Sequence, residues 1–256
     1  MLYPLVEDSV LLVEKGMVAA TGNIYTGLLE FDDMAFVLHA LREDDLFGDI
    51  GANIGVYTIL AAKNVGAKVI AVEPIPSTFS HLSNNIFLNK ITNLVTAHKI
   101  GVGSDNAVLG FTNSIDSMNH VVPDYCGEKR DDILEIPVKK MDDLFLASVP
   151  VIIKMDIEGF EWPALNGAKK LLLSGKVQAI IIELNGCGNF YGFSDNDLHS
   201  MLVSYGYKPY AYNAFERSFS PLEHFGKYNT IYIKNINWAI QRVVNSRKYK
   251  ILGKLV

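Results

Sequence analysis

The feature that most constrains the fold of this chain is a glycine run between an apolar stretch and a helical one. Residues 46–50 have the composition of a buried strand, Gly51 and Gly55 follow, and residues 57–64 have the composition of a helix. Glycine allows a tight backbone turn against a ligand, and the N–H groups at the start of the helix are free to bind that ligand. This pattern indicates a nucleotide cradle, half of a βαβ unit, with an ordinary strand–turn–helix junction as the alternative.

An acidic residue at the end of the next apolar stretch supports the cradle. Residues 67–72 read as a second strand, and Glu73 ends it eighteen residues after Gly55. In cradles of this type, a carboxylate at that position binds the ribose hydroxyls of the nucleotide. Glu73 is therefore a predicted cofactor-binding residue.

The glycine spacing indicates which nucleotide is bound. The dinucleotide fingerprint is G-x-G-x-x-G, whereas Gly51 and Gly55 are four residues apart with Asn53 between them, which weighs against a NAD-dependent oxidoreductase. Asp49 lies two residues before Gly51, where a carboxylate suits the ammonium group of an amino-acid end. S-Adenosylmethionine has such an end and is the predicted cofactor. Its predicted contacts in this loop are Asp49, Gly51, Asn53 and Gly55.

Composition limits the class of protein. The 256 residues are 49% hydrophobic and 20% charged, which fits one large domain with a buried core. The net charge of −5 argues against a nucleic-acid partner, because phosphate binding needs a basic surface. Cys126 and Cys187 lack metal-ligand spacing and fit a reducing, cytoplasmic setting. We expect no signal peptide and no transmembrane segment, because the N-terminus carries acids and no run of eighteen apolar residues occurs.

Strands and helices alternate over residues 46–235, which predicts an α/β domain with a doubly wound, mostly parallel sheet of seven strands. Such sheets bind ligands at the carboxyl ends of their strands. The last two strands are expected to pair antiparallel, and a further strand is expected at 134–140. The seven strands are predicted at 46–50, 68–72, 94–100, 150–155, 177–184, 207–213 and 229–234, and the helices at 57–64, 77–89, 162–174 and 195–205.

Three segments depart from this alternation. Residues 1–45 are predicted to cap the core, with a turn and strand at 21–25. Residues 104–133 are polar, turn-rich and too long for a simple connection, which predicts a lid or substrate loop. Residues 236–256 form a basic tail that either touches a membrane surface or an acidic partner, or forms a C-terminal helix that packs on its own domain or makes an oligomer contact.

A second group of carboxylates follows the strand predicted at 150–155. Asp156 lies at its end, where it is placed to orient a substrate hydroxyl or to act as a general base. Glu158 and Glu161 begin the next helix and either join the site or cap that helix. These oxygen ligands are compatible with a divalent metal, but no metal site is predicted.

Other polar residues follow the next strand or lie in the long loop. Asn185 is predicted to face the substrate, whereas Glu183 is explained equally well by bonds to nearby backbone groups. Asn189 and Tyr191 are predicted to meet a hydroxylated substrate, with ordinary turn chemistry as the alternative. His120 is either a general base, because imidazole titrates near neutrality, or an exposed loop residue.

Residues 49–55, 73–74 and 154–161 together resemble the FkbM family of S-adenosylmethionine-dependent methyltransferases. The approach at 25–31 and the link at 140–144 share the resemblance, which covers roughly residues 25–235. It implies a class I methyltransferase fold, which is Rossmann-like. It also implies O-methylation, commonly of sugar or polyketide hydroxyls in natural-product and surface-polysaccharide pathways.

The resemblance also implies roles for single residues. Glu73 matches the family's ribose-binding acid, and Val102 and Gly103 fall where the adenine usually lies. Asp156 and Glu158 match the family's own signature. We expect a base to remove the proton of the acceptor hydroxyl, with Glu158 and Asn185 orienting the acceptor. The candidates for this base are Asp156 and His120. A domain that binds the cofactor without turnover remains an alternative.

Overall fold

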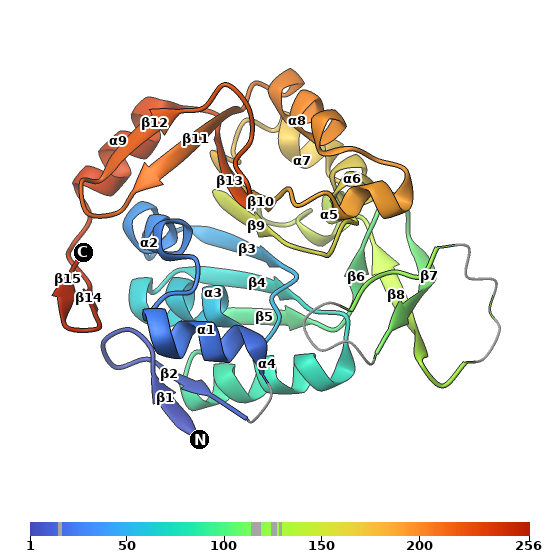
Figure 1. Cartoon of the computed structure of the whole chain (residues 1–256), viewed down its shortest axis with the longest axis horizontal. Coiled ribbons are helices and arrows are strands. Elements are labelled where there is room, and N and C mark those ends of the chain that lie inside the picture. Colours follow the sequence, from blue (N-terminus) through green and yellow to red (C-terminus); the bar gives the residue numbers. More distant parts are fainter. Residues whose placement is uncertain (15–16, 114–118, 124–126, 128–129) are drawn as a thin grey trace.

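The computed structural model of the chain describes residues 1–14, 17–113, 119–123, 127 and 130–256. Its central sheet is built from β3 (Leu46–Ile50), β4 (Lys68–Val72), β5 (Val95–His98), β9 (Ile152–Met155), β10 (Ala179–Glu183), β11 (Lys208–Asn213), β12 (Ser218–Pro221) and β13 (Asn229–Ile233). In the described residues these strands form the order β12-β11-β13-β10-β9-β3-β4-β5 (Figure 1). The strands from β10 to β5 are parallel, and β13 is antiparallel to both β10 and β11.

Helices cover both faces of the sheet because its central strands are apolar on both sides. Along β9, Ile152 belongs to one core cluster and Ile153 to the other. The first cluster includes α2 (Phe31–Ala40), α3 (Val56–Ile59, continued by a π-helical turn at Leu60–Val65), α4 (Pro76–Leu88) and α9 (Ile236–Val244). The second includes α5 (Met141–Leu144), α6 (Glu161–Asn166), α7 (Lys169–Leu173) and α8 (Asp195–Ser204).

The predicted α/β architecture is confirmed, with three differences in detail. β12 is an eighth strand at the edge of the sheet. The helix expected at 162–174 is broken at Gly167 and Ala168 into α6 and α7. Residues 21–25, expected as a turn and strand, lie in α1 (Val18–Thr26). Gly22 lies inside α1 although glycine has a low helix propensity. The Leu29 side chain packs over Gly22 and occupies the space that a Cβ would need, so this packing favours glycine at that position.

A second sheet lies beside the carboxyl ends of the parallel strands. It is built from β6 (Gly101–Val102), β7 (Ala107–Thr112) and β8 (Ile133–Lys139) in the order β6-β8-β7, and Figure 1 shows it at one side of the molecule. The strand expected at 134–140 is β8 and does not join the central sheet. β7 lies within the 104–133 segment that is expected to be a loop. Residues 114–118, 124–126 and 128–129 of that segment lie outside the described residues.

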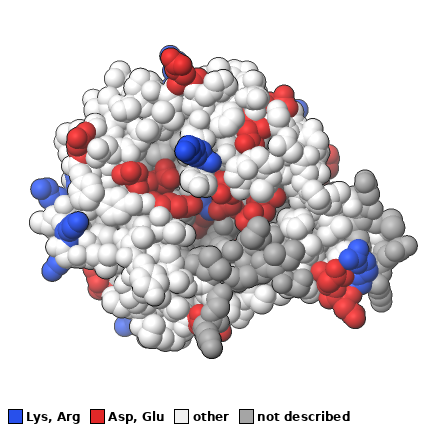
Figure 2. Space-filling model, viewed as in Figure 1, with Lys and Arg blue, Asp and Glu red and all other residues white. Residues whose placement is uncertain are grey.

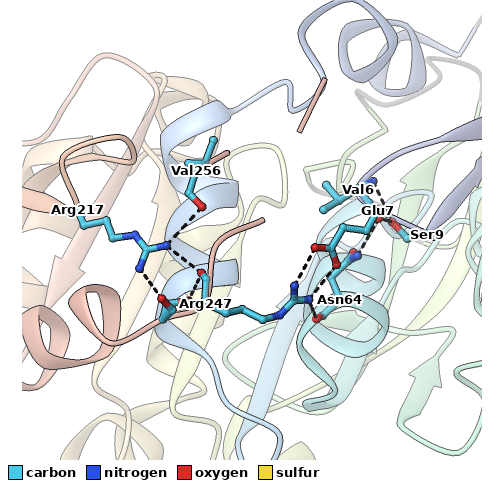
Figure 3. A network of polar contacts seen from close by, with 8 residues as sticks. Val6, Glu7, Ser9, Asn64, Arg217, Arg247 and Val256 are labelled. Atoms are coloured by element: carbon cyan, nitrogen blue, oxygen red, sulfur yellow. Dashed lines mark hydrogen bonds and ion pairs between the residues drawn. The ribbon is translucent and has the colours of Figure 1, made fainter. Parts of the chain in front are cut away.

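The N-terminal segment and the C-terminal tail lie against each other on the face of the sheet that the first core cluster covers. β1 (Leu2–Pro4) pairs with β2 (Val10–Leu12), β14 (Lys250–Ile251) pairs with β15 (Lys254–Leu255), and α9 packs on α2. Arg247 forms an ion pair with Glu7 at 2.8 Å and donates to the backbone oxygen of Asn64 at 2.8 Å (Figure 3). The alternative in which the tail packs on its own domain is therefore the one the structure supports. Among the described helices, none is long and apolar enough to span a bilayer.

Arg217, the residue before β12, holds this tail in place through hydrogen bonds. Its guanidinium donates to the backbone oxygens of Ser246 at 2.6 Å, Arg247 at 2.9 Å, Val243 at 3.0 Å and Val256 at 3.4 Å. Figure 3 shows the bonds to Arg247 and Val256. Hydrogen bonds that involve a charged group are worth about 1.5–3 kcal/mol each, although several made by one side chain do not add fully.

We expect Arg217→Ala to lower the free energy of unfolding by about 2–3 kcal/mol and to expose the tail to protease, because four backbone oxygens lose their charged donor. Lys250→Ala is the matched control, because Lys250 is exposed in the same tail. Urea unfolding and limited proteolysis measure the two effects. Equal stability of the two variants would contradict the anchoring role.

Candidate active site

A pocket opens at the carboxyl ends of β3, β4, β9 and β10. Its volume is about 220 Å³, more than ten times the roughly 10–15 Å³ that one water molecule requires. Segments far apart in the sequence contribute to its walls. The lining residues are Leu29, Ile50, Gly51, Asn53, Val72, Glu73, Pro74, Ile75, Thr78, Ile100, Gly101, Val102, Phe111, Asn119, Val121, Asp156, Ile157, Glu158, Phe160 and Glu183.

Gly51 brings the two predicted motif loops into contact. It has φ +77°, and a Cβ built on it would lie 1.8 Å from the backbone oxygen of Asp156. No side chain fits in that space, so glycine is required both for its conformation and for the close approach. The glycine run after β3 and the acidic run after β9 therefore form one continuous floor of the pocket.

Glu73 lies in the pocket wall as predicted. Its two carboxylate oxygens accept hydrogen bonds from the backbone N–H groups of Asn53 and Ile75, each at 3.0 Å. Each oxygen keeps a further lone pair that is available to a hydroxyl in the pocket. Burial raises the pKa of Glu73 to about 7. Glu73 thus fixes the glycine loop and presents the acceptor atoms that ribose hydroxyls require.

Asp49 lies behind the pocket and is not among its lining residues. Its side chain is fully buried, and its Oδ2 accepts a hydrogen bond from Thr58 at 2.6 Å. Its Oδ1 is buried without a hydrogen-bond partner among the described residues, and burial raises the pKa of Asp49. This placement does not provide the predicted contact with an ammonium group. Asp49 instead joins β3 to the start of α3.

Of the other predicted cofactor residues, two line the pocket and two support its wall from behind. Asn53 and Val102 line the pocket, and Asn53 has a positive φ of 52° within the glycine loop. Gly55 starts α3 with φ +92°, and a Cβ on it would lie 2.6 Å from Leu82 Cδ1. Gly103 is buried beside β8, where its N–H donates to Lys139. Gly55 and Gly103 therefore shape the pocket from behind.

Asp156 lines the pocket beside a buried lysine that has no assigned role in the sequence prediction. Lys154 Nζ lies 2.9 Å from Asp156 Oδ2 and 5.2 Å from the centroid of the Tyr57 ring. The side chain of Lys154 is 6% exposed. Burial opposes the charge of Lys154, but the neighbouring carboxylates of Asp156, Glu30 and Asp49 raise its pKa. Glu30 also accepts a hydrogen bond from the Tyr57 hydroxyl at 2.6 Å.

Two further carboxyl groups line the pocket next to Asp156. Burial and the charge of Asp156 raise the pKa of Glu158 to about 7. Burial and the charges of Asp156 and Glu158 raise the pKa of Glu183 to about 8. Glu161, in contrast, is buried and accepts a hydrogen bond from the Ile157 N–H at 3.0 Å. Glu161 therefore serves the turn at the start of α6, whereas Glu158 and Glu183 face the pocket.

Four of the predicted catalytic and substrate-binding residues lie outside the pocket lining. Asn185 is exposed and accepts from the Cys187 N–H at 2.9 Å, and Asn189 is exposed and donates to Gly186. The Tyr191 hydroxyl donates to the backbone oxygen of Val121 at 2.8 Å, and the Tyr191 ring packs on Phe160, so Tyr191 supports the wall. His120 lies near Phe190, with ring centroids 5.6 Å apart. The base candidate that the structure places in the pocket is Asp156.

Figure 2 shows acidic side chains gathered around a hollow in this face of the molecule. The pocket carboxylates that we identify are Glu73, Asp156, Glu158 and Glu183. Within the part of the chain that the structure describes, no group of three or more His, Cys, Asp or Glu side chains has the arrangement of a metal site. Carboxyl groups in a pocket can also act directly, by accepting hydrogen bonds and by taking up protons.

We expect the free energy of unfolding to fall as pH rises from about 5 to about 7.5. The pKa of the buried Glu73 and Glu161 is about 7 in the fold, against a usual value of 4.5, so the folded state binds more protons in this window. Stability is then fully present below the usual value and is lost towards pH 7, by on the order of 3 kcal/mol for each of the two groups. Urea unfolding at several pH values measures the slope. Glu161→Gln is expected to flatten it, and a slope of opposite sign would contradict the assignment.

The pocket fits S-adenosylmethionine at several points. Glu73 meets the requirement of a ribose, and the backbone around Gly51 is open because no Cβ fits there. Ile100, Val102 and Phe111 supply apolar surface for an adenine ring. The carboxylates of Asp156 and Glu158 are the lining groups that suit a positively charged amino-acid end.

Comparison with known proteins agrees with this site. The profile of the methyltransferase FkbM domain matches residues 49–209, which begins in β3 and includes all four pocket carboxylates. The solved structure of the methyltransferase FkbM from Methylobacillus flagellatus has the same fold, with a TM-score of 0.50 and 22% identity over 75% of this chain and 44% of that chain.

Curated relatives are also methyltransferases. The chain is 28% identical to Methyltransferase 1 of Beauveria bassiana, over 54% of this chain and 64% of the relative. It is 28% identical to the hexuronic acid methyltransferase AglP of Haloferax volcanii, over 61% of this chain and 62% of the relative. Each match spans less than two thirds of the relative's length.

These findings identify the family of the chain. A methyltransferase family profile covers more than half of the chain and the curated relatives are methyltransferases, which supports the prediction of a methyltransferase against the alternative of a NAD-dependent oxidoreductase. The fold is the class I methyltransferase fold, and the cofactor is S-adenosylmethionine. The chain belongs to the FkbM family of S-adenosylmethionine-dependent methyltransferases.

Proposed function

We propose that the protein transfers a methyl group to a hydroxyl oxygen of a sugar, a polysaccharide or a related polyhydroxylated natural product. The observation that carries this proposal is the set of carboxyl groups of Asp156, Glu158 and Glu183 in the pocket wall. A sugar hydroxyl is a poor acid, so its methylation needs a nearby group that accepts the proton. Carboxyl groups in one pocket, two of them with a pKa of about 7–8, meet that need near neutral pH.

The cofactor supplies a methyl group on a positively charged sulfur. The protein's part is to hold the acceptor oxygen in line with that methyl group, which provides much of the rate acceleration. Glu73 and the Gly51 loop position the cofactor side of the pocket. Asp156 and Glu158 are placed to bind the acceptor hydroxyl, because they lie on the same wall beyond Gly51.

The charge of the pocket favours a neutral acceptor. An anionic acceptor would meet several carboxylates around Asp156, and like charges in a partly buried site repel each other. A relative that acts on hexuronic acid supports a sugar as the acceptor class. We therefore expect neutral sugars to be better acceptors than their uronic acids.

The described residues of the 104–133 segment are proposed to form part of the acceptor side of the pocket. Phe111, Asn119 and Val121 come from this segment and line the pocket. Phe111 and Val121 form an isolated bridge, and Val121 accepts the hydrogen bond of Tyr191. The segment is thus tied to the loop after β10, which supports a role in enclosing the substrate.

The test is an acceptor screen with radiolabelled S-adenosylmethionine and neutral methyl hexosides, the corresponding uronic acids and simple polyketide alcohols. The proposal predicts label in a neutral sugar, stable to mild alkali as an ether is. Label found only in alkali-labile esters or in amines would contradict it.

Glu73→Ala is expected to weaken binding of S-adenosylhomocysteine by roughly 30-fold or more, because two ribose hydroxyls lose a charged acceptor and the Asn53 loop loses its partner. Calorimetry measures the affinity. Glu43→Ala is the control, because Glu43 is an exposed acid outside the pocket lining. Unchanged affinity in Glu73→Ala would remove Glu73 from the ribose site.

A further inference from the structure

Glu183 and Asp156 lie side by side at the carboxyl ends of β10 and β9, where the pocket opens. β9 and β10 are parallel, and the last register pair between them is Met155 with Ile182. One position beyond this pair, Asp156 follows β9 and Glu183 is the last residue of β10, so the two residues lie at the same point of the sheet. Both line the pocket, and burial, together with the carboxyl group of Asp156, raises the pKa of Glu183.

The two members of this pair have different electrostatic partners. Asp156 receives a hydrogen bond from the buried ammonium of Lys154 at 2.9 Å, which fixes its position and balances its charge. Among the ion pairs of the described residues, none involves Glu183. A carboxylate that is ion-paired to a buried lysine is a weak proton acceptor, whereas an unpaired one next to a negative charge is a strong one.

We propose that Glu183 is the proton acceptor of the methyl-transfer reaction, and that Asp156 and Lys154 act as the positioning pair beside it. This inference rests on the proposed function, because it names the base for that reaction. The acceptor hydroxyl donates its proton to the Glu183 carboxylate while its oxygen forms the bond to the methyl carbon. The carbon–sulfur bond breaks, and its electron pair stays on the sulfur as a neutral thioether.

The charged groups around Glu183 all bear on its proton affinity. Burial raises the pKa of Glu183 most, the charges of Asp156 and Glu158 after β9 raise it further, and Lys154 on β9 lowers it, with a net value of about 8. Part of the enzyme is then ionised at neutral pH, and the ionised part grows up to about pH 8. A base with a pKa near the working pH is also the most effective one.

The first experiment measures the proton affinity without using activity. Protein labelled with ¹³C at the glutamate carboxyl carbon is titrated by NMR, and Glu183→Gln identifies the Glu183 signal. We expect a midpoint near 8 in the wild type, and a midpoint at least one pH unit lower in Asp156→Asn, because the neighbouring negative charge is removed. A wild-type midpoint near the usual 4.5 would overturn the proposal.

The second experiment measures the rate of methyl transfer to the best neutral methyl hexoside from pH 6 to 9. We expect Glu183→Gln to lower kcat by about 100-fold or more, to remove the rise toward pH 8, and to leave affinity for S-adenosylhomocysteine within about threefold. Glu223→Gln, at an exposed site outside the pocket, is expected to behave as the wild type. A Glu183→Gln variant with wild-type kcat would overturn the proposal. A wild type that methylates none of these acceptors would contradict the proposed function, whereas the NMR titration would still uphold or overturn the role of Glu183 as the proton acceptor of the pocket.

Discussion

Gly51→Ala is expected to abolish measurable cofactor binding and to lower the free energy of unfolding by more than about 3 kcal/mol. The added Cβ would lie 1.8 Å from the backbone oxygen of Asp156, so the loop after β3 or the loop after β9 must move. Either movement separates the two motif loops that form the floor of the pocket. Calorimetry with S-adenosylhomocysteine and urea unfolding measure the two effects.

Gly175→Ala is the matched control for this substitution. Gly175 has φ +72°, close to the +77° of Gly51, but among the described residues no atom lies within 4 Å of the position that its Cβ would take. Its replacement costs only the left-handed conformation, about 1–2 kcal/mol, and should leave the affinity unchanged. If the two variants lose equal stability and both bind the cofactor normally, the close approach of the two loops is not needed for binding.

Lys154→Met is expected to lower the free energy of unfolding by about 3–5 kcal/mol at pH 7.5. The substitution leaves Asp156, Asp49 and Glu30 without the ammonium they surround. In the wild type, the raised pKa of Lys154 keeps its contribution constant between pH 6 and 8, because the loss occurs only at more alkaline pH. In the variant, uncompensated carboxylates take up protons in the fold, so its stability falls as pH rises through this range.

The gap between the wild type and Lys154→Met should therefore widen from pH 6 to pH 8. Lys169→Met, at an exposed position of α7, serves as the control and should show neither the loss nor the pH trend. Urea unfolding at both pH values gives the comparison. A loss that is the same at pH 6 and pH 8 would mean that Lys154 contributes through packing rather than through its charge.

Local signals in the sequence are enough to predict the central sheet and the cofactor side of the pocket. The glycine run fixes the turn after β3, and Glu73 follows an apolar strand at the ribose position, so each prediction depends on neighbours in the chain. Gly51, Asn53 and Glu73 line the pocket accordingly, and Val102, whose role the family resemblance implies, lines it as well.

The placement of Asp49 depends on the alternation of side chains along a strand. Asp49 shares the face of β3 on which Phe47 packs in the first core cluster, whereas Ile50 faces the second cluster. A period of two therefore directs Asp49 toward Thr58 of α3, and Asp49 does not line the pocket. The motif alone suggests a ligand contact because it ignores that alternation.

The acceptor side requires contacts between distant segments, which the sequence does not display. Glu183 meets Asp156 only through the register of β9 and β10, and Asn185 turns outward two residues later. Lys154 carries the one local signal, a lysine within the otherwise apolar residues 151–155, which indicates a buried partner. Leu29 reaches the pocket from the N-terminal segment without any local pattern that predicts it.

A crystal structure of the protein with S-adenosylhomocysteine tests the central claim most directly. We expect the ribose hydroxyls against Glu73, the adenine beside Val102, and the sulfur directed toward the wall formed by Asp156 and Glu183. A ligand bound away from Glu73, or one whose sulfur faces away from these two carboxyl groups, would contradict both the cofactor site and the proposed chemistry.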